Sequence, residues 1–67
     1  MEITFNKQKQ VIEAQTSLQN LLNEKFGEKQ NGIAVAINQN IVSKKHWATH
    51  LLQPNDQILV ITATQGG

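Results

Sequence analysis

The strongest strand signal in the 67-residue sequence is Gln57-Ile58-Leu59-Val60-Ile61-Thr62-Ala63. β-Branched residues dominate it, and both alternating sets of positions are apolar. Ile58 and Val60 point to one side, while Leu59 and Ile61 point to the other. A strand that is apolar on both faces is usually central in its sheet. We therefore predict a central strand over residues 57–63.

Shorter strands are predicted upstream of this one. Alternation of apolar and polar residues, together with the turn residues between the runs, predicts strands at residues 1–6, 11–14, 33–38 and 41–42. The first two form a hairpin around a polar turn at residues 7–9, and a tight turn at Gln39-Asn40 joins the other two. A further turn is predicted at Pro54-Asn55-Asp56, where asparagine tolerates a left-handed conformation.

One helix is predicted, over residues 17–26. Its apolar stripe is formed by Leu18, Leu21, Leu22 and Phe26. Thr16 with Gln19 fits a capping box at the start, and Gly27 fits a C-cap. Residues 43–52 are irregular, with room for a single helical turn. The fold class is α+β, a mixed sheet of about five strands with one helix on one face.

A single helix leaves the other sheet face open. If Ile58 and Val60 face the helix, then Leu59 and Ile61 lie on the open face beside Ala34 and Ala36. Such an apolar patch suggests a partner-binding face. The alternative is burial of these side chains in the chain's own core or in a homodimer.

Composition excludes several classes of function. The absence of cysteine excludes a disulfide framework, a cysteine-based zinc site and a thiolate nucleophile. Six lysines, no arginine and a net charge of +1 give no basic field for a nucleic acid. No apolar run spans a membrane, and the N-terminus does not resemble a signal peptide. A cytoplasmic protein is expected.

The last two residues are Gly66-Gly67. A tail without side chains can thread a narrow channel. Its terminal carboxylate is ionised at neutral pH, because the reference pKa of an α-carboxyl is about 3.3–3.7. It is therefore a nucleophile toward the α-phosphate of ATP, giving an acyl-adenylate that sulfur or nitrogen displaces. A flexible tail without function is the alternative.

Several other residues could have a functional role, but for each of them a structural or solvent-exposed role is the simpler interpretation. His46 and His50 have the i, i+4 spacing of metal ligands. The sequence offers no cysteine or third histidine to complete a site, so no metal site is predicted. Trp47 fits the core better than a partner contact. Lys44-Lys45 fits a solvated loop better than a steering patch. Glu24 and Glu28 lack a pocket-forming second domain for acid–base catalysis.

The ordered set of motifs resembles the ubiquitin-like β-grasp family and, within it, the ThiS sulfur carriers of thiamine biosynthesis. The resemblance runs end to end, although Ser43 stands where the family usually has proline and Asn55 where it usually has glycine. It rests on Ile3-Thr4-Phe5-Asn6, Thr16-Ser17-Leu18-Gln19-Asn20-Leu21-Leu22, Ala34-Val35-Ala36-Ile37-Asn38, Ile41-Val42, Trp47, Asp56-Gln57-Ile58 and Gly66-Gly67.

The resemblance implies a β-grasp domain over residues 1–63 and a flexible tail over residues 64–67. It implies that a ubiquitin-activating-type adenylyltransferase (ThiF-like), using ATP and Mg²⁺, adenylates Gly67. Thr64, Gln65 and Gly66 thread into the partner. The adenylate is converted to a thiocarboxylate, which is expected to donate sulfur to thiazole synthase (ThiG-like). The protein binds no cofactor and is a co-substrate, not a catalyst.

Three other functions stay open on the sequence alone. One is a β-grasp sulfur carrier for another pathway, of the molybdopterin synthase small-subunit type. Another is a ubiquitin-like modifier that joins its C-terminus to lysine. The last is a binding module that uses its tail or sheet edge without chemistry.

Overall fold

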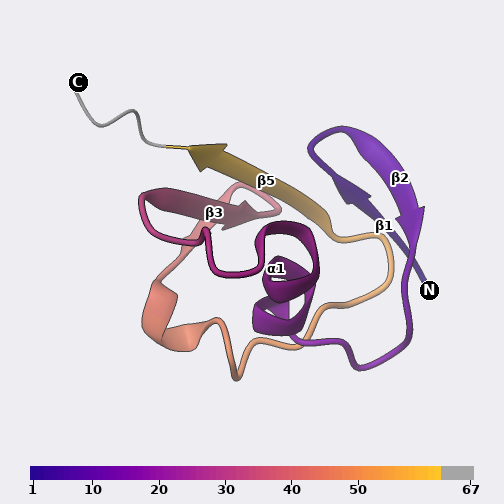
Figure 1. The fold of residues 1–67 in the computed structure, drawn as a ribbon. Coiled ribbons are helices and arrows are strands. Elements are labelled where there is room, and N and C mark those ends of the chain that lie inside the picture. Colours follow the sequence, from indigo (N-terminus) through magenta and orange to yellow (C-terminus); the bar gives the residue numbers. More distant parts are fainter. Residues whose placement is uncertain (63–67) are drawn as a thin grey trace.

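The structure is a computed structural model that describes residues 1–62. Within them, one α-helix lies across one side of a five-stranded sheet (Figure 1). The elements in chain order are β1 (Glu2–Phe5), β2 (Gln8–Val11), α1 (Leu18–Phe26), β3 (Ile33–Ile37), β4 (Asn40–Val42), a 3-10 helical turn (Lys44–His46) and β5 (Gln57–Thr62). No helix in this part of the chain is long and apolar enough to cross a membrane.

The prediction that the last strand is central is confirmed. The strand order is β2-β1-β5-β3-β4, with β5 parallel to β1 and antiparallel to β3. The sheet is therefore mixed, and the predicted α+β class is confirmed. The predicted end of this strand, Ala63, lies outside the described residues.

The predicted position of the second strand is wrong. We expected residues 11–14, but β2 is Gln8–Val11 and pairs antiparallel with β1 from Phe5↔Gln8 to Glu2↔Val11. The hairpin turn is Asn6-Lys7, and both residues have positive φ, 48° and 71°. Two such residues make the tight turn that matches strand twist, so the polar residues after it enter the ladder at once.

The second hairpin turn is displaced in the same way. It is formed by Asn38 and Gln39, at φ 50° and 74°, one residue earlier than predicted. Asn40 already pairs with Ile37 as the first residue of β4. The turn predicted around Asn55 is confirmed, with φ of 69° at that residue.

The helix begins with a different cap from the one predicted. Ser17 Oγ accepts a hydrogen bond from the backbone N–H of Asn20 at 3.1 Å, whereas Thr16 Oγ1 donates to the carbonyl of Glu13. The backbone of Thr16 is held outside the helix because its carbonyl accepts from Leu52 N at 2.9 Å. The C-cap at Gly27 is confirmed, with φ of 58° and its N–H donating to Asn23 O.

The core lies between α1 and one face of the sheet. Trp47 belongs to it, 2% exposed, with Nε1 donating to the carbonyl of Val42 at 2.9 Å, which confirms the core interpretation. The single helical turn expected in residues 43–52 is Lys44–His46. The buried apolar residues are Ile3, Phe5, Leu18, Leu21, Leu22, Val35, Ile37, Trp47, Leu52, Ile58 and Val60.

The two candidate caps can be separated by mutation. We expect Ser17→Ala to lower the free energy of unfolding by about 1 kcal/mol, the usual contribution of a serine N-cap. Thr16→Ala removes an exposed bond outside the helix and should cost less. Urea unfolding of both variants measures the difference, and an equal or larger loss for Thr16→Ala would contradict the observed cap.

Candidate functional site

The predicted tail follows the central strand directly. Thr62 is the last residue of β5 and pairs with Ile33, the first residue of β3. In Figure 1, the C-terminal end of β5 extends past the β1–β2 hairpin. The tail residues predicted to carry function, Thr64, Gln65, Gly66 and Gly67, lie outside the described residues.

The side chain of Asn6 completes the backbone hydrogen bonding along one edge of β5. Strand β1 pairs with β5 only at Thr4↔Gln57 and Phe5↔Ile58, because the chain then turns away at Asn6. Asn6 N donates to Ile58 O at 2.9 Å, and Asn6 Oδ1 accepts from Val60 N at 2.8 Å. The amide thus takes the place of the next backbone carbonyl of a neighbouring strand. Sequence reasoning missed this role, although an asparagine at the junction of a predicted strand and turn was a usable signal, because asparagine tolerates positive φ.

A buried carboxylate fixes the other end of the strand. Asp56 is 6% exposed, and its Oδ2 accepts from Gln53 N at 2.8 Å while Oδ1 accepts from Asn38 Nδ2 at 3.0 Å. Asn38 Oδ1 accepts from Gln57 N, so the asparagine joins the turn, the loop and β5. Buried polar groups that are fully paired make a local structure rigid. These bonds fix the start of β5 to the turn that precedes it and to the turn at Asn38.

The predicted patch is assembled on the open face of the sheet. Leu59 is 43% exposed and Ile61 54%, while their neighbours Ile58 and Val60 are buried against the helix. The register sets Ala36 opposite Leu59 and Ala34 opposite Ile61. Burial of Leu59 and Ile61 in the chain's own core, the alternative considered from sequence, is therefore wrong.

The patch extends to a residue that sequence reasoning missed. Ile41 on β4 pairs with Ala36 and is 72% exposed. Ile41, Ala36 and Leu59 thus form a row across three strands. The alternation of β4 was the signal, since its neighbour Val42 pairs with the buried Val35.

A shallow groove runs beside Leu59. Its cavity volume is about 280 Å³, and Lys7 supplies a positive charge while no acidic residue lines it. The lining residues are Thr4, Lys7, Ala36, Gln39, Gln57, Ile58 and Leu59. This geometry suits an apolar side chain of a partner with a carboxylate nearby.

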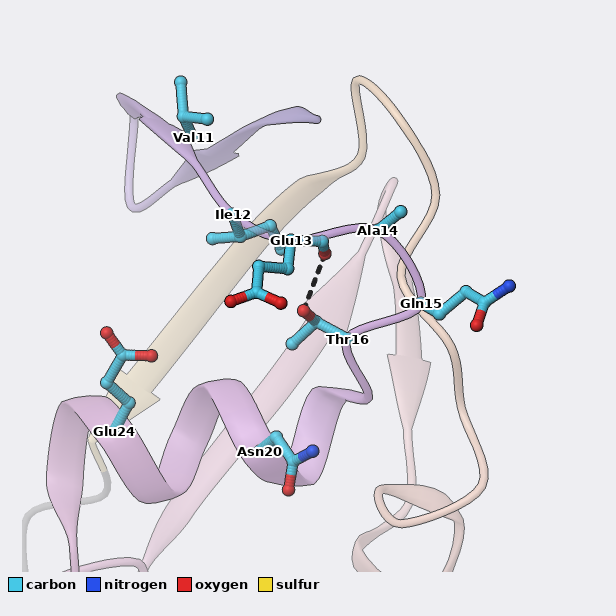
Figure 2. Close-up of a pocket in the computed structure, with 8 residues that line it drawn as sticks. All are labelled: Val11, Ile12, Glu13, Ala14, Gln15, Thr16, Asn20 and Glu24. Atoms are coloured by element: carbon cyan, nitrogen blue, oxygen red, sulfur yellow. Dashed lines mark hydrogen bonds between the residues drawn. The ribbon is translucent and has the colours of Figure 1, made fainter.

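A larger hollow lies elsewhere, between α1 and residues 11–16. Figure 2 shows the side chains of Glu13 and Glu24 pointing toward it. Its cavity volume is about 620 Å³, and Thr16 and Asn20 also line it. Glu28, which the sequence pairs with Glu24, lies beyond the end of the helix in the following turn. The two carboxylates therefore do not share a helix.

The histidine pair is part of the segment that covers the helix start. His50 N donates to His46 O at 2.9 Å, and the carbonyl of His50 accepts from Leu18 N. In residues 1–62, no three side chains of histidine, cysteine, aspartate or glutamate come together as metal ligands. Lys44 and Lys45 are exposed beside them, with Lys44 Nζ donating to Asn31 Oδ1 over 3.5 Å.

Comparison with known proteins gives consistent results. The sequence model of the ThiS family matches residues 1–67. The chain is 42% identical over 67 residues to the sulfur carrier protein ThiS of Escherichia coli (strain K12), and the match covers all of both chains.

The fold is similar to two solved structures of a thiamine biosynthesis protein from Geobacter metallireducens. The crystal structure, of the protein there called ThiS, superposes with a TM-score of 0.86 over 100% of each chain. The solution structure gives 0.77 over 100% of this chain and 88% of the other. Both are 14% identical in sequence, so they support the fold alone.

The difference in exposure between neighbouring residues of β5 predicts a small loss of stability for substitutions on the open face and a large one for substitutions on the buried face. We expect Leu59→Ser and Ile61→Ser to change the free energy of unfolding by about 0.5 kcal/mol or less, as at other surface positions. Ile58→Ala should cost about 2–5 kcal/mol, because it leaves a cavity in the core. Urea unfolding compares the three, and a large loss for Leu59→Ser would mean that this side chain is buried.

The role of Asn6 is testable with two variants that both tolerate positive φ. Asn6→Asp keeps an acceptor for Val60 N, whereas Asn6→Gly removes it, at a cost of about 1 kcal/mol for the lost bond. Hydrogen exchange at the Val60 amide should accelerate in Asn6→Gly and stay slow in Asn6→Asp. Equal protection in both would show that the side chain does not hold β5.

Proposed function

The chain belongs to the ThiS family and is a sulfur carrier of thiamine biosynthesis, and from this we propose that its Gly67 carboxylate is the group that carries the sulfur. It serves as a protein co-substrate and not as an enzyme. The observation that supports the assignment to Gly67 is that the central strand β5 ends at Thr62, five positions before Gly67 in the sequence. A rigid domain thus presents a terminus free of bulky side chains.

The chemistry needs no side chain of this protein. A carboxylate oxygen of Gly67 attacks the α-phosphate of ATP, and pyrophosphate leaves to give the acyl-adenylate. Hydrosulfide then attacks the acyl carbon, the bond to the phosphate oxygen breaks so that AMP leaves, and loss of the sulfur-bound proton gives the thiocarboxylate. Because the sequence contains no cysteine, no internal thiol competes for the activated acyl group.

We further propose that two partners use the open face in turn. The first is a ubiquitin-activating-type adenylyltransferase that uses ATP and Mg²⁺, and the second is thiazole synthase. Leu59, Ile61, Ala34 and Ala36 supply the apolar contact that the predicted patch implies, and Ile41 enlarges it. Thr64, Gln65 and Gly66 thread into each partner's active site. This ATP-dependent exchange would take place in the cytoplasm.

Mass spectrometry of the intact protein tests the carrier chemistry. After incubation with the activating enzyme, ATP and a sulfide source, we expect the mass gain of one oxygen replaced by one sulfur, located on Gly67. A variant with one residue appended after Gly67 should keep its fold and gain nothing, because the nucleophilic carboxylate is displaced. Equal sulfur loading of the extended variant would refute the assignment to Gly67.

Binding of the activating enzyme tests the docking face. Leu59→Asp and Ile61→Asp should each weaken binding by about tenfold or more, since loss of a central apolar contact costs at least 1–2 kcal/mol. Leu51→Asp is the matched control, because Leu51 is 49% exposed but lies outside the patch. Equal affinities for all three variants in titration calorimetry would remove the open face from the interface.

A further inference from the structure

The dipeptide Asn31-Gly32 differs from the other asparagine-containing dipeptides in the residue that follows the asparagine. Of the seven asparagines in the sequence, Asn31 is the one followed by glycine. A glycine has no Cβ, so its backbone nitrogen can approach the preceding side chain without steric hindrance. At the other six positions the next residue carries a side chain that crowds this approach.

The structure puts this dipeptide in an exposed turn between α1 and β3. Asn31 and Gly32 are both exposed, and Gly32 has φ of 77°, a conformation suited to glycine. Lys44 Nζ donates to Asn31 Oδ1 over 3.5 Å. The side-chain carbonyl is therefore polarised by an ammonium group.

Four of the other six asparagines are held by the fold. Asn20 and Asn23 lie in α1, where the backbone nitrogens that follow them belong to the helix. Asn6 and Asn38 use their side-chain amides to bind β5. These constraints oppose the backbone rearrangement that ring closure requires.

We propose that Asn31 is a site of spontaneous deamidation, in which it forms a succinimide with the backbone nitrogen of Gly32. The nitrogen of Gly32 loses its proton to solvent base and attacks Cγ of Asn31, forming a C–N bond. The side-chain nitrogen takes up a proton and leaves as ammonia. Water then opens the ring at either carbonyl, giving aspartate or isoaspartate. Each event consumes one water and releases one ammonia, without any change of oxidation state.

Lys44 assists the closure of the ring. During the attack, negative charge develops on Oδ1 of Asn31, and the ammonium group that donates to this oxygen stabilises it. Lys44→Gln should therefore slow the reaction. The substitution is on the surface and leaves the core intact.

The product changes the surface beside the start of the tail. Deamidation lowers the net charge of +1 by one and sets a carboxylate next to Lys44. Isoaspartate also adds one carbon to the backbone at position 31, two residues before Ile33, which pairs with Thr62. If the proposed function holds, an aged carrier is presented to its partners with an altered tail base.

Peptide mapping of the full chain tests the chemistry without any partner. The protein is kept in mildly alkaline buffer and then cleaved after lysine, which releases residues 30–44 with Asn31, Asn38 and Asn40 in one peptide. We expect Asn31 to convert about tenfold faster than either internal control, a difference of about 1.4 kcal/mol in activation free energy. Both aspartate and isoaspartate should form, faster at higher pH.

Three results would overturn the proposal. They are equal rates at the three asparagines, aspartate as the sole product, and a rate that does not rise with pH. An unchanged rate in Lys44→Gln would remove the role of Lys44. The variant Asn31→Gln is the matched control, since its longer side chain closes a less favourable ring and should stay intact.

The effect on function is measured separately. Fresh protein, the isolated isoaspartate form and Asn31→Asp are each incubated with the activating enzyme and ATP. We expect the isoaspartate form to be charged about tenfold more slowly than fresh protein, which corresponds to about 1.4 kcal/mol. Equal rates would refute the functional consequence. Failure to charge even the fresh protein would count against the proposed function and not against deamidation.

Discussion

The rest of the fold depends on the hydrogen bond from Val60 N to Asn6 Oδ1, which is 2.8 Å long. It pairs a part of β5 that β1 does not reach. Strand β5 is central, yet its parallel neighbour β1 ends after only two paired positions. A central strand left unpaired on one edge would expose backbone groups and move more freely. Asn6 prevents this while it turns the chain into the hairpin. The C-terminal part of β5 is therefore held by that one side chain together with β3.

Amide side chains do similar work at the other turns. Asn6, Asn38 and Asn55 all adopt positive φ, where asparagine costs less than other residues with a side chain. Asn38 also uses its amide to join Asp56 to β5. These three asparagines account for part of a sequence in which amide side chains outnumber charged ones. A domain of this size buries a small apolar core, so turns stabilised by their own hydrogen bonds contribute to its stability.

The sequence predicted those features that depend on apolar periodicity. It predicted β5, β3, the helix stripe and the outward direction of Leu59 and Ile61, because burial on a sheet face imposes strict alternation. It misplaced β2, since an edge strand made of polar residues carries no such pattern. It could not separate Thr16 from Ser17 as the N-cap, because both residue types are good caps. The tertiary hydrogen bond from Leu52 N to Thr16 O keeps Thr16 outside the helix and makes Ser17 the cap. Asn6 and Ile41 were missed because their roles depend on which strands are neighbours.

The architecture separates recognition from reaction. The described residues form one helix on one sheet, and their hollows are open grooves rather than enclosed clefts. Such a domain cannot exclude water from a reacting group, which an acyl-adenylate requires if it is to meet sulfur before hydrolysis. Under the proposed function, the reaction therefore takes place inside a partner, and the domain delivers its terminus there. A central strand that ends at Thr62 and an apolar face on the same sheet suit both parts of this proposed role with one layer of structure.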